Sequence, residues 1–211
     1  SRGLGDVYKR QDELWLVAGG IFGGSLYFFT ENTALGITQA SNVSFIICTA
    51  PLLTTILSLL FYKSEKASKG LIYGSLLALM GVGLIVFNGS FVLKISPIGD
   101  LLTLLAALSW AFYSLIIKKM AGRYPTVFIT RKIFFYGVLT ILPAFLLHPL
   151  HPDTVVLLQP AVLFNLLFLA VLASLICYVL WNVVLKQLGT VRASNYIYLN
   201  PLFTLVGSAI L

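Results

Sequence analysis

The chain has 211 residues, of which 59% are hydrophobic and only 10% are charged. Soluble domains carry about 25% charged residues and about 50% apolar ones or fewer, so this composition excludes an ordinary water-soluble domain. The net charge of +7 does not indicate a nucleic-acid partner, because the basic residues follow a membrane topology.

Seven long and nearly uncharged runs follow one another along the chain. About 20 apolar residues cross a bilayer as a helix, and backbone groups in lipid must bond within their own segment. The sequence therefore predicts an all-α polytopic membrane protein whose surroundings are the lipid bilayer. The expected spans are residues 14–34, 37–61, 70–89, 99–120, 126–147, 160–185 and 190–211. Residues 1–11 are polar and resemble translated linker sequence, so we expect a non-native leader outside the fold.

The first run carries an acidic residue near its expected outer end. Glu31 lies in Phe28-Phe-Thr-Glu-Asn-Thr33, and a charge inside a span is costly and often functional. Either Glu31, with its neighbour Asn32, contacts a substrate or a proton at the mouth of a cavity, or it fixes helix packing. The same run holds glycines at G-x-x-x-G spacing, which favours a close helix contact within the bundle or in a homodimer.

The second and seventh runs open with matching sequences. Gly36-Ile-Thr-Gln-Ala-Ser-Asn42 begins one and Gly189-Thr-Val-Arg-Ala-Ser-Asn195 begins the other, and each leads to a proline, Pro51 or Pro201. Because the second run is expected to enter from outside and the seventh from inside, the two copies are inverted. Inverted repeats are typical of secondary transporters, and the spacing predicts a repeating unit of five spans.

Each of these prolines predicts a helix kink, because proline removes a backbone donor. A kinked helix either lines a cavity and contacts substrate or serves packing alone. Asn200 directly precedes Pro201, and Asn42 lies at the matched position of the repeat. Side-chain amides in lipid bond across helices, so both are candidates for the cavity or for structure.

Aromatic side chains in the spans are further candidates for a pocket, although aromatic residues also pack ordinary cores. Trp110 and Tyr113 are three residues apart and therefore share a helix face. The other candidates are Trp181, Asn182 and Tyr196.

The basic residues predict the orientation, since all of them except Lys94 fall on one side of the expected topology. The positive-inside rule places that side, and the start of the first helix, in the cytoplasm. Arg131 lies about one turn into the fifth expected helix. It either extends to the cytoplasmic surface or contacts an anion at an inner gate.

This orientation can be tested by labelling single cysteines in intact cells, in a chain from which Cys48 and Cys177 have been removed. A cysteine at Ser64 should react only from the cytoplasmic side, and one at Asp153 only from outside, because these positions lie in opposite connections. The reverse pattern would invert the topology.

Catalytic signatures are absent from the sequence. No H-E-x-x-H, G-x-S-x-G or Walker motif occurs, so we predict no enzyme, no cofactor, no metal site and no ATP-driven pumping. His148 and His151 fall in one expected outer loop. Cys48 and Cys177 are expected to be buried apolar residues within spans and not a disulfide.

Three blocks resemble the EamA-type members of the drug/metabolite transporter superfamily. They are residues 99–113, the stretch from Tyr178-Val-Leu-Trp-Asn182 through Gly189 to Asn200-Pro201, and Ala34 to Leu57 with its Pro51. The resemblance covers almost everything from about Leu14 to Leu211. It implies ten helices in two inverted five-helix repeats. Residues 12–96 would be the last three helices of the first repeat, and residues 97–211 the first four of the second.

The resemblance also implies a function. Such permeases move small metabolites, including amino acids and their derivatives, mostly outwards, by alternating access around a largely apolar cavity. This chain would then lie in a bacterial inner membrane and bind a small-molecule substrate, with protons as an open second partner. The alternative is a membrane scaffold or assembly protein that transports nothing.

Overall fold

The computed structural model describes residues 10–62, 69–87, 96–147, 154–200 and 203. Within these residues every regular element is a helix, as the sequence predicts. Four helical stretches are long and apolar enough to cross a membrane: Asn42–Phe61, Pro97–Ala121, Thr126–Leu146 and Pro160–Leu188. The chain is therefore an all-helical, multi-pass membrane protein, and the count of seven spans stays a prediction.

The helical elements follow the hydrophobic runs closely. The first run is one continuous helix with a π-helical segment in its middle, and it begins inside the polar stretch assigned to the leader. The sixth run also contains a π-helical segment. In chain order the elements are α1 (Arg10–Gly20), η2 (Ile21–Ser25), α2 (Leu26–Ile37), α3 (Ala40–Ile47), α4 (Ala50–Phe61), α5 (Lys69–Phe87), α6 (Pro97–Ala121), α7 (Thr126–Leu147), α8 (Thr154–Leu157), α9 (Pro160–Leu167), η3 (Phe168–Ile176), α10 (Cys177–Leu188), α11 (Thr190–Asn195) and η4 (Tyr196–Leu199).

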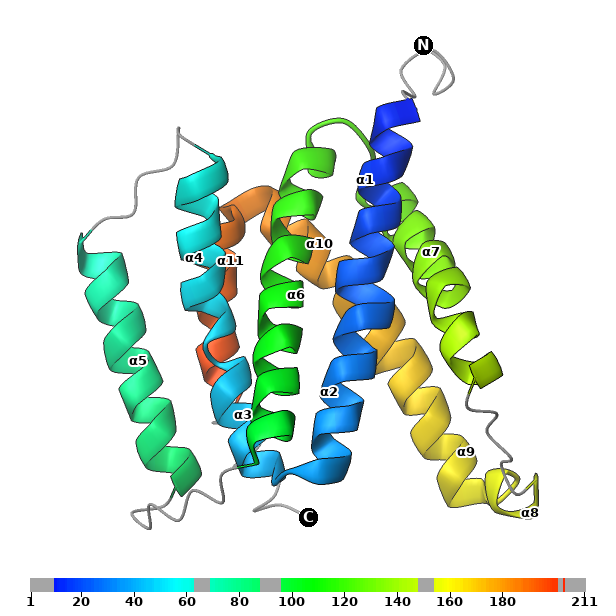
Figure 1. Cartoon of the computed structure of the whole chain (residues 1–211). Coiled ribbons are helices and arrows are strands. Elements are labelled where there is room, and N and C mark those ends of the chain that lie inside the picture. The colour runs from blue at the N-terminus through cyan, green and yellow to red at the C-terminus, as the bar shows by residue number, and fades with distance from the viewer. Residues whose placement is uncertain (1–9, 63–68, 88–95, 148–153, 201–202, 204–211) are drawn as a thin grey trace.

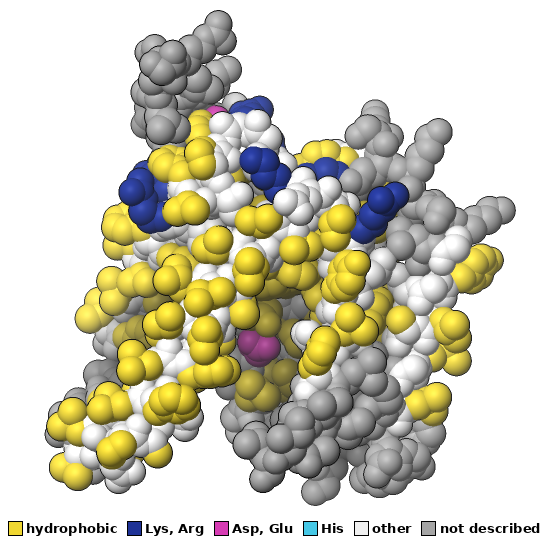
Figure 2. All heavy atoms as spheres, turned by 180° about the vertical axis from the view of Figure 1, so that it is seen from behind, with side chains coloured by type: hydrophobic (Ala, Val, Ile, Leu, Met, Phe, Trp, Pro, Cys, Tyr) yellow, Lys and Arg dark blue, Asp and Glu magenta, His cyan; other side chains and the backbone are white. Residues whose placement is uncertain are grey.

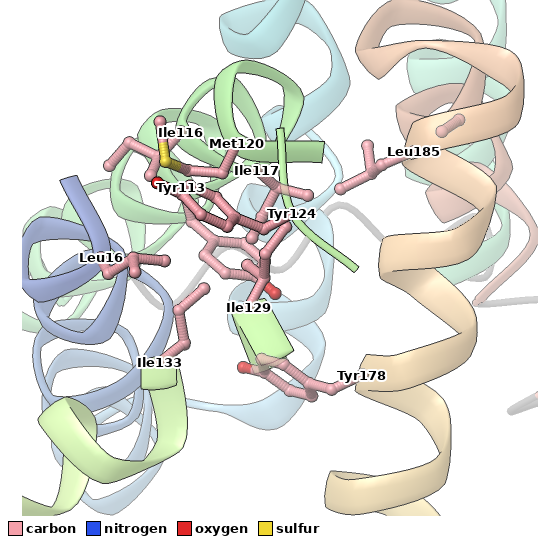
Figure 3. Close-up of a cluster of buried hydrophobic side chains, with 11 residues drawn as sticks. Leu16, Tyr113, Ile116, Ile117, Met120, Tyr124, Ile129, Ile133, Tyr178 and Leu185 are labelled. Carbon is pink, nitrogen blue, oxygen red and sulfur yellow. The ribbon is translucent and has the colours of Figure 1, made fainter. Parts of the chain in front are cut away.

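Helix α6 lies at the centre of the bundle (Figure 1) and contacts α1, α2, α3, α4 and α10. Its alanines at 106, 107 and 111 are fully buried, so neighbouring helices can approach closely. The main apolar core lies where α1, α6, α7 and α10 meet, as Figure 3 shows. Leu16, Tyr113, Met120, Ile133 and Leu185 are among its members.

The second run is broken in its middle, as Pro51 predicts. Helix α3 ends at Ile47 and α4 begins at Ala50, with Pro51 in its first turn. Proline is tolerated there because the missing N–H would have no helical partner in any case. In the seventh run, α11 passes into the 3₁₀ turn η4 just before Asn200. Pro201 and the two histidines lie outside the described residues.

The G-x-x-x-G glycines bring two helices of this chain together. A Cβ atom on Gly20 would lie 2.6 Å from the Tyr136 Cβ and 2.9 Å from the Gly137 backbone nitrogen. A Cβ on Gly24 would lie 3.0 Å from the Gly137 Cα. One face of the first helix therefore packs against the α7 backbone, and a homodimer remains a prediction.

Basic side chains gather at one end of the bundle, and hydrophobic side chains cover the surface beyond that end (Figure 2). The basic side chains that the structure describes lie at the end of α6, in the turn after it, in the first half of α7, at the end of α10 and in α11. Arg131 is exposed at the start of α7, with its guanidinium carbon 5.7 Å from the centre of the Phe128 ring.

One cysteine departs from the expectation. Cys48 is buried, whereas Cys177 is exposed. The reason is the course of the sixth run, which leans away from the other helices in its first half (Figure 1). Neither α9 nor η3 contains a buried residue, and the run joins the core only in α10, where Tyr178, Asn182 and Leu185 are buried.

Candidate functional site

A cavity of about 340 Å³ lies beside α6 near the breaks in the second and seventh runs. On α6 its wall residues lie near mid-length, and on the second run they flank the break between α3 and α4. Most of its wall is apolar or aromatic, with Asn200 as its amide. The lining residues are Tyr27, Ile47, Ala50, Ala107, Trp110, Trp181, Tyr196, Ile197 and Asn200.

Trp110 is the centre of an aromatic cluster at this cavity. The centre of its ring lies 5.0 Å from that of Tyr27 and 5.8 Å from that of Trp181. Behind it, the ring of Tyr178 lies at 5.6 Å in an edge-on arrangement. The indole nitrogens of Trp110 and Trp181 are buried and have no hydrogen-bond partner among the described residues. A buried donor without a partner is energetically costly, and such donors are often found at functional sites.

Glu31 reaches the cavity through Tyr27. The Tyr27 hydroxyl donates a hydrogen bond of 2.9 Å to the Glu31 carboxylate, one helical turn further along α2. Glu31 is half-buried and is not itself part of the cavity wall. A change in the charge of Glu31 would therefore act on the cavity through the Tyr27 hydroxyl, whose oxygen can still accept a hydrogen bond.

A second polar network lies behind the aromatic cluster and joins three helices. The Tyr113 hydroxyl donates to the Asn182 side-chain oxygen at 2.8 Å, and the Asn182 amide donates to the Thr130 hydroxyl at 2.8 Å. All three residues are at most 2% exposed. Because every polar atom named here has a partner, the network stabilises the packing of α6, α7 and α10.

The π-helical segment η2 also takes part in this packing. The Tyr178 hydroxyl on α10 donates to the Gly23 carbonyl at 2.7 Å, and the Ser109 hydroxyl on α6 donates to the Phe22 carbonyl at 2.7 Å. Side chains from two other helices therefore bind backbone carbonyls of the irregular segment. This is the usual way in which a departure from α-helical bonding is tolerated in a membrane helix.

The structure places the predicted site residues in two groups. Trp110, Trp181, Tyr196 and Asn200 line the cavity, and Pro51 follows the lining residue Ala50. The candidates outside the wall are Glu31, Asn32, Asn42, Tyr113 and Asn182, and Arg131 lies at the basic end. Asn42 is buried and Asn32 is exposed.

Sequence reasoning missed five wall residues: Tyr27, Ile47, Ala50, Ala107 and Ile197. Helical spacing could have found two of them. Tyr27 lies four residues before Glu31, and Ala107 lies three residues before Trp110, so each shares a face with a residue already chosen.

Comparison of the sequence with known proteins identifies the family. The sequence model of the EamA-like transporter family matches residues 4–87 and 97–211. The chain belongs to the EamA-like transporter family. This confirms the resemblance to the drug/metabolite transporter superfamily, and the matched residues include every wall residue of the cavity.

Curated relatives of this EamA-like chain carry transporter names. An uncharacterized transporter of Archaeoglobus fulgidus is 30% identical over 87% of this chain and 63% of that protein. The uncharacterized transporter YyaM of Bacillus subtilis is 27% identical over 89% of this chain and 61% of that protein. A probable amino-acid metabolite efflux pump of Salmonella typhimurium is 28% identical over 72% of this chain and 52% of that protein.

The chain thus spans less than two thirds of the length of these three relatives. Among solved structures, a crystal structure matches it with a TM-score of 0.74 at 19% identity, over 100% of this chain and 72% of that chain. At that identity the likeness shows the fold alone.

Proposed function

We propose that this EamA-like chain forms part of a secondary transporter that exports small metabolites from a bacterial cell by alternating access. The observation that carries the proposal is the aromatic cavity beside two interrupted helices. Transporter sites typically lie near the bilayer midplane, where helices are broken and backbone groups line a cavity. The wall residues Ala107 and Trp110 lie at mid-length of α6, and Ile47 and Ala50 flank the break between α3 and α4.

The helices of the chain further support two inverted halves. The run from α1 to α2 and the run from α9 to α10 each contain a π-helical segment, η2 and η3. Each of these runs is followed by an interrupted one, α3–α4 and α11–η4 respectively. We therefore assign seven spans to this chain, within a ten-helix arrangement of two five-helix repeats whose rocking opens the cavity to each side in turn.

For the substrate we propose an amino acid or a related derivative. The Salmonella relative is named a probable amino-acid metabolite efflux pump, and the cavity has the properties such a ligand needs. Its volume of about 340 Å³ is at the lower end of small-molecule sites. Aromatic faces can hold an apolar side chain or an ammonium group, while Asn200 and the Tyr27 hydroxyl provide polar contacts.

Glu31 is then the proposed link to protons or to a substrate amine, acting through Tyr27. Replacing Glu31 with glutamine in the complete protein should lower export at least about tenfold, because the charge is lost while an oxygen remains to accept the Tyr27 hydrogen bond. Export of radiolabelled amino acids from loaded cells measures the effect, with the amount of protein in the membrane determined in parallel.

The matched control is Glu13→Gln. Glu13 is also partly buried, but it pairs with Lys132 at the basic end, away from the cavity wall. Export by this variant should stay within about twofold of the unchanged protein. Normal export by Glu31→Gln would make Glu31 a structural residue, and no export by the unchanged protein for any amino acid would remove the proposed substrate class.

A further inference from the structure

A second hollow of about 410 Å³ lies between α1, α4 and α6, toward the basic end of the bundle. We call it the α1–α4 groove. Figure 1 shows α6 lying between α1 and α4 at this end. The residues that line it are Trp15, Ala18, Phe22, Phe61, Tyr62, Phe112, Leu115, Ile116 and Lys119. The wall is apolar apart from Lys119, the hydroxyl group of Tyr62 and the indole nitrogen of Trp15.

The groove is separate from the aromatic cavity. Successive residues of an α-helix turn by 100°, so Phe112, Ile116 and Lys119 lie on the side of α6 opposite Trp110. No lining residue is shared between the two hollows. Phe61, at the rim, is 65% exposed, so the groove opens to the surroundings of the helices, which for a membrane protein are lipid.

Two ammonium groups lie over aromatic rings on opposite flanks of this groove. The Lys119 nitrogen lies 3.7 Å from the centre of the Trp15 ring on α1. The Lys118 nitrogen lies 4.3 Å from the centre of the Tyr62 ring at the end of α4. The Tyr62 ring is in turn held by a hydrogen bond of 3.2 Å from its hydroxyl to the Leu115 carbonyl.

The nearby carboxylates do not neutralise Lys119. Asp12 binds Arg123 at 2.6 Å and Glu13 binds Lys132 at 2.9 Å. Among the described residues, the contact of the Lys119 ammonium is the Trp15 ring alone. An aromatic face stabilises a cation but does not cancel its charge, so this ammonium can still attract an anion at the membrane surface.

From this arrangement we propose that the α1–α4 groove is a binding site for an anionic phospholipid. One acyl chain lies along the apolar wall formed by Ala18, Phe22 and Phe112, and the phosphate lies at the groove mouth near Lys118 and Lys119. Basic pockets between membrane helices at the side richer in Lys and Arg are a recognised way of holding anionic head groups. The site does not depend on whether the aromatic cavity transports amino acids.

The test uses the fluorescence of Trp15, which lines the groove. The complete protein is reconstituted in phosphatidylcholine nanodiscs that contain a small fraction of a lipid brominated on its acyl chains. The brominated lipid is either phosphatidylglycerol, which is anionic, or phosphatidylcholine, which is neutral. Bromine atoms quench the fluorescence of a nearby tryptophan. Subtracting the signal of the Trp15→Phe variant isolates Trp15 from Trp110 and Trp181. The brominated anionic lipid should quench Trp15 at a several-fold lower mole fraction than the brominated neutral lipid.

Neutralising both lysines, as in the double variant Lys118→Gln and Lys119→Gln, should abolish that preference. A basic residue near an anionic surface contributes about fivefold in binding, so loss of these charges is enough to remove a several-fold preference. The double variant with arginine at both positions should keep it. Lys186→Gln is the matched control, since Lys186 is an exposed residue at the same end but outside the groove, in the last turn of α10.

Three results would overturn the proposal. Equal quenching by the two brominated lipids would show that the groove has no head-group preference. An equal loss of preference in Lys186→Gln would show a diffuse surface charge. No quenching of Trp15 by either lipid would show that protein covers the groove, from a second copy or from elsewhere in the complete protein.

Discussion

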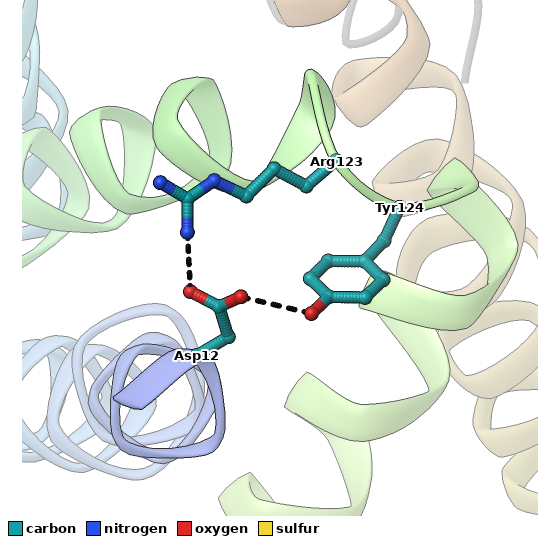
Figure 4. Close-up of polar contacts among 3 residues, drawn as sticks. All are labelled: Asp12, Arg123 and Tyr124. Atoms are coloured by element: carbon teal, nitrogen blue, oxygen red, sulfur yellow. Dashed lines mark hydrogen bonds and ion pairs between the residues drawn. The ribbon is translucent and has the colours of Figure 1, made fainter. Parts of the chain in front are cut away.

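Replacing Arg123 with alanine should lower the free energy of unfolding by about 3 kcal/mol, which is toward the lower end of the cost of breaking a buried ion pair. The reason is the carboxylate it leaves behind. Asp12 on α1 is 2% exposed and binds the Arg123 guanidinium at 2.6 Å and the Tyr124 hydroxyl at 2.9 Å, as Figure 4 shows. Without Arg123, a buried charge keeps one neutral donor. The Arg123 side chain itself is 47% exposed, which limits the loss.

The measurement is unfolding of the purified protein in mixed detergent micelles by titration with a denaturing detergent. Lys132→Ala is the control, since it breaks the pair of Lys132 and Glu13, whose side chains are 27% and 25% exposed. Neither of these side chains is fully buried as Asp12 is, so the cost should be smaller, about 1 kcal/mol. Equal losses in the two variants would contradict the special role of the buried carboxylate of Asp12.

Replacing Gly20 with alanine should destabilise the protein by about 1–3 kcal/mol, the range found for overpacked interiors. The new methyl group would lie 2.6 Å from the Tyr136 Cβ and 2.9 Å from the Gly137 nitrogen. These are backbone or near-backbone atoms of α7 that cannot turn aside, so α1 and α7 must separate. Thermal stability in detergent, followed by the loss of the monodisperse peak in size-exclusion chromatography, measures the effect.

Gly36→Ala provides the matched control in the same continuous helix, near the end of α2. A Cβ atom there meets nothing within 4 Å, and alanine is the better helix former by up to about 1 kcal/mol. This variant should therefore be neutral or slightly more stable. A Gly20→Ala protein as stable as Gly36→Ala would mean that the approach of α1 to α7 is not tight.

Much of the candidate site could be found from residue types and their spacing. Aromatic and amide groups inside apolar runs are natural candidates for a pocket, and four of them line the cavity: Trp110, Trp181, Tyr196 and Asn200. Tyr113 shares a helix face with Trp110, so the same reasoning predicts it at the cavity. It lies behind the wall instead, bonded to Asn182, because α7 and α10 cover that part of α6. Periodicity identifies a face, but not which neighbour packs against it.

The ion pair at the basic end had no strong sequence signal. Asp12 directly follows the polar stretch taken as a leader, and Arg123 and Tyr124 are more than 100 residues away along the chain. Their partnership depends on α1 lying beside the turn between α6 and α7, which is a tertiary arrangement. Charged residues at helix ends are ordinarily solvated, so nothing local distinguishes a buried carboxylate from an exposed one.

The class of protein, the helical runs, the break at Pro51 and the gathering of basic residues at one end all follow from the order of residues along the chain. These properties are local, because the hydrophobicity of about 20 consecutive residues decides insertion and a proline acts on its own turn. The packing of the helices against one another sets the other features: which faces meet at the cavity, which glycines touch α7, and why Cys177 is exposed while Cys48 is buried. Apolar side chains pack as favourably against lipid as against another helix. The composition of a membrane helix therefore does not distinguish these two surroundings.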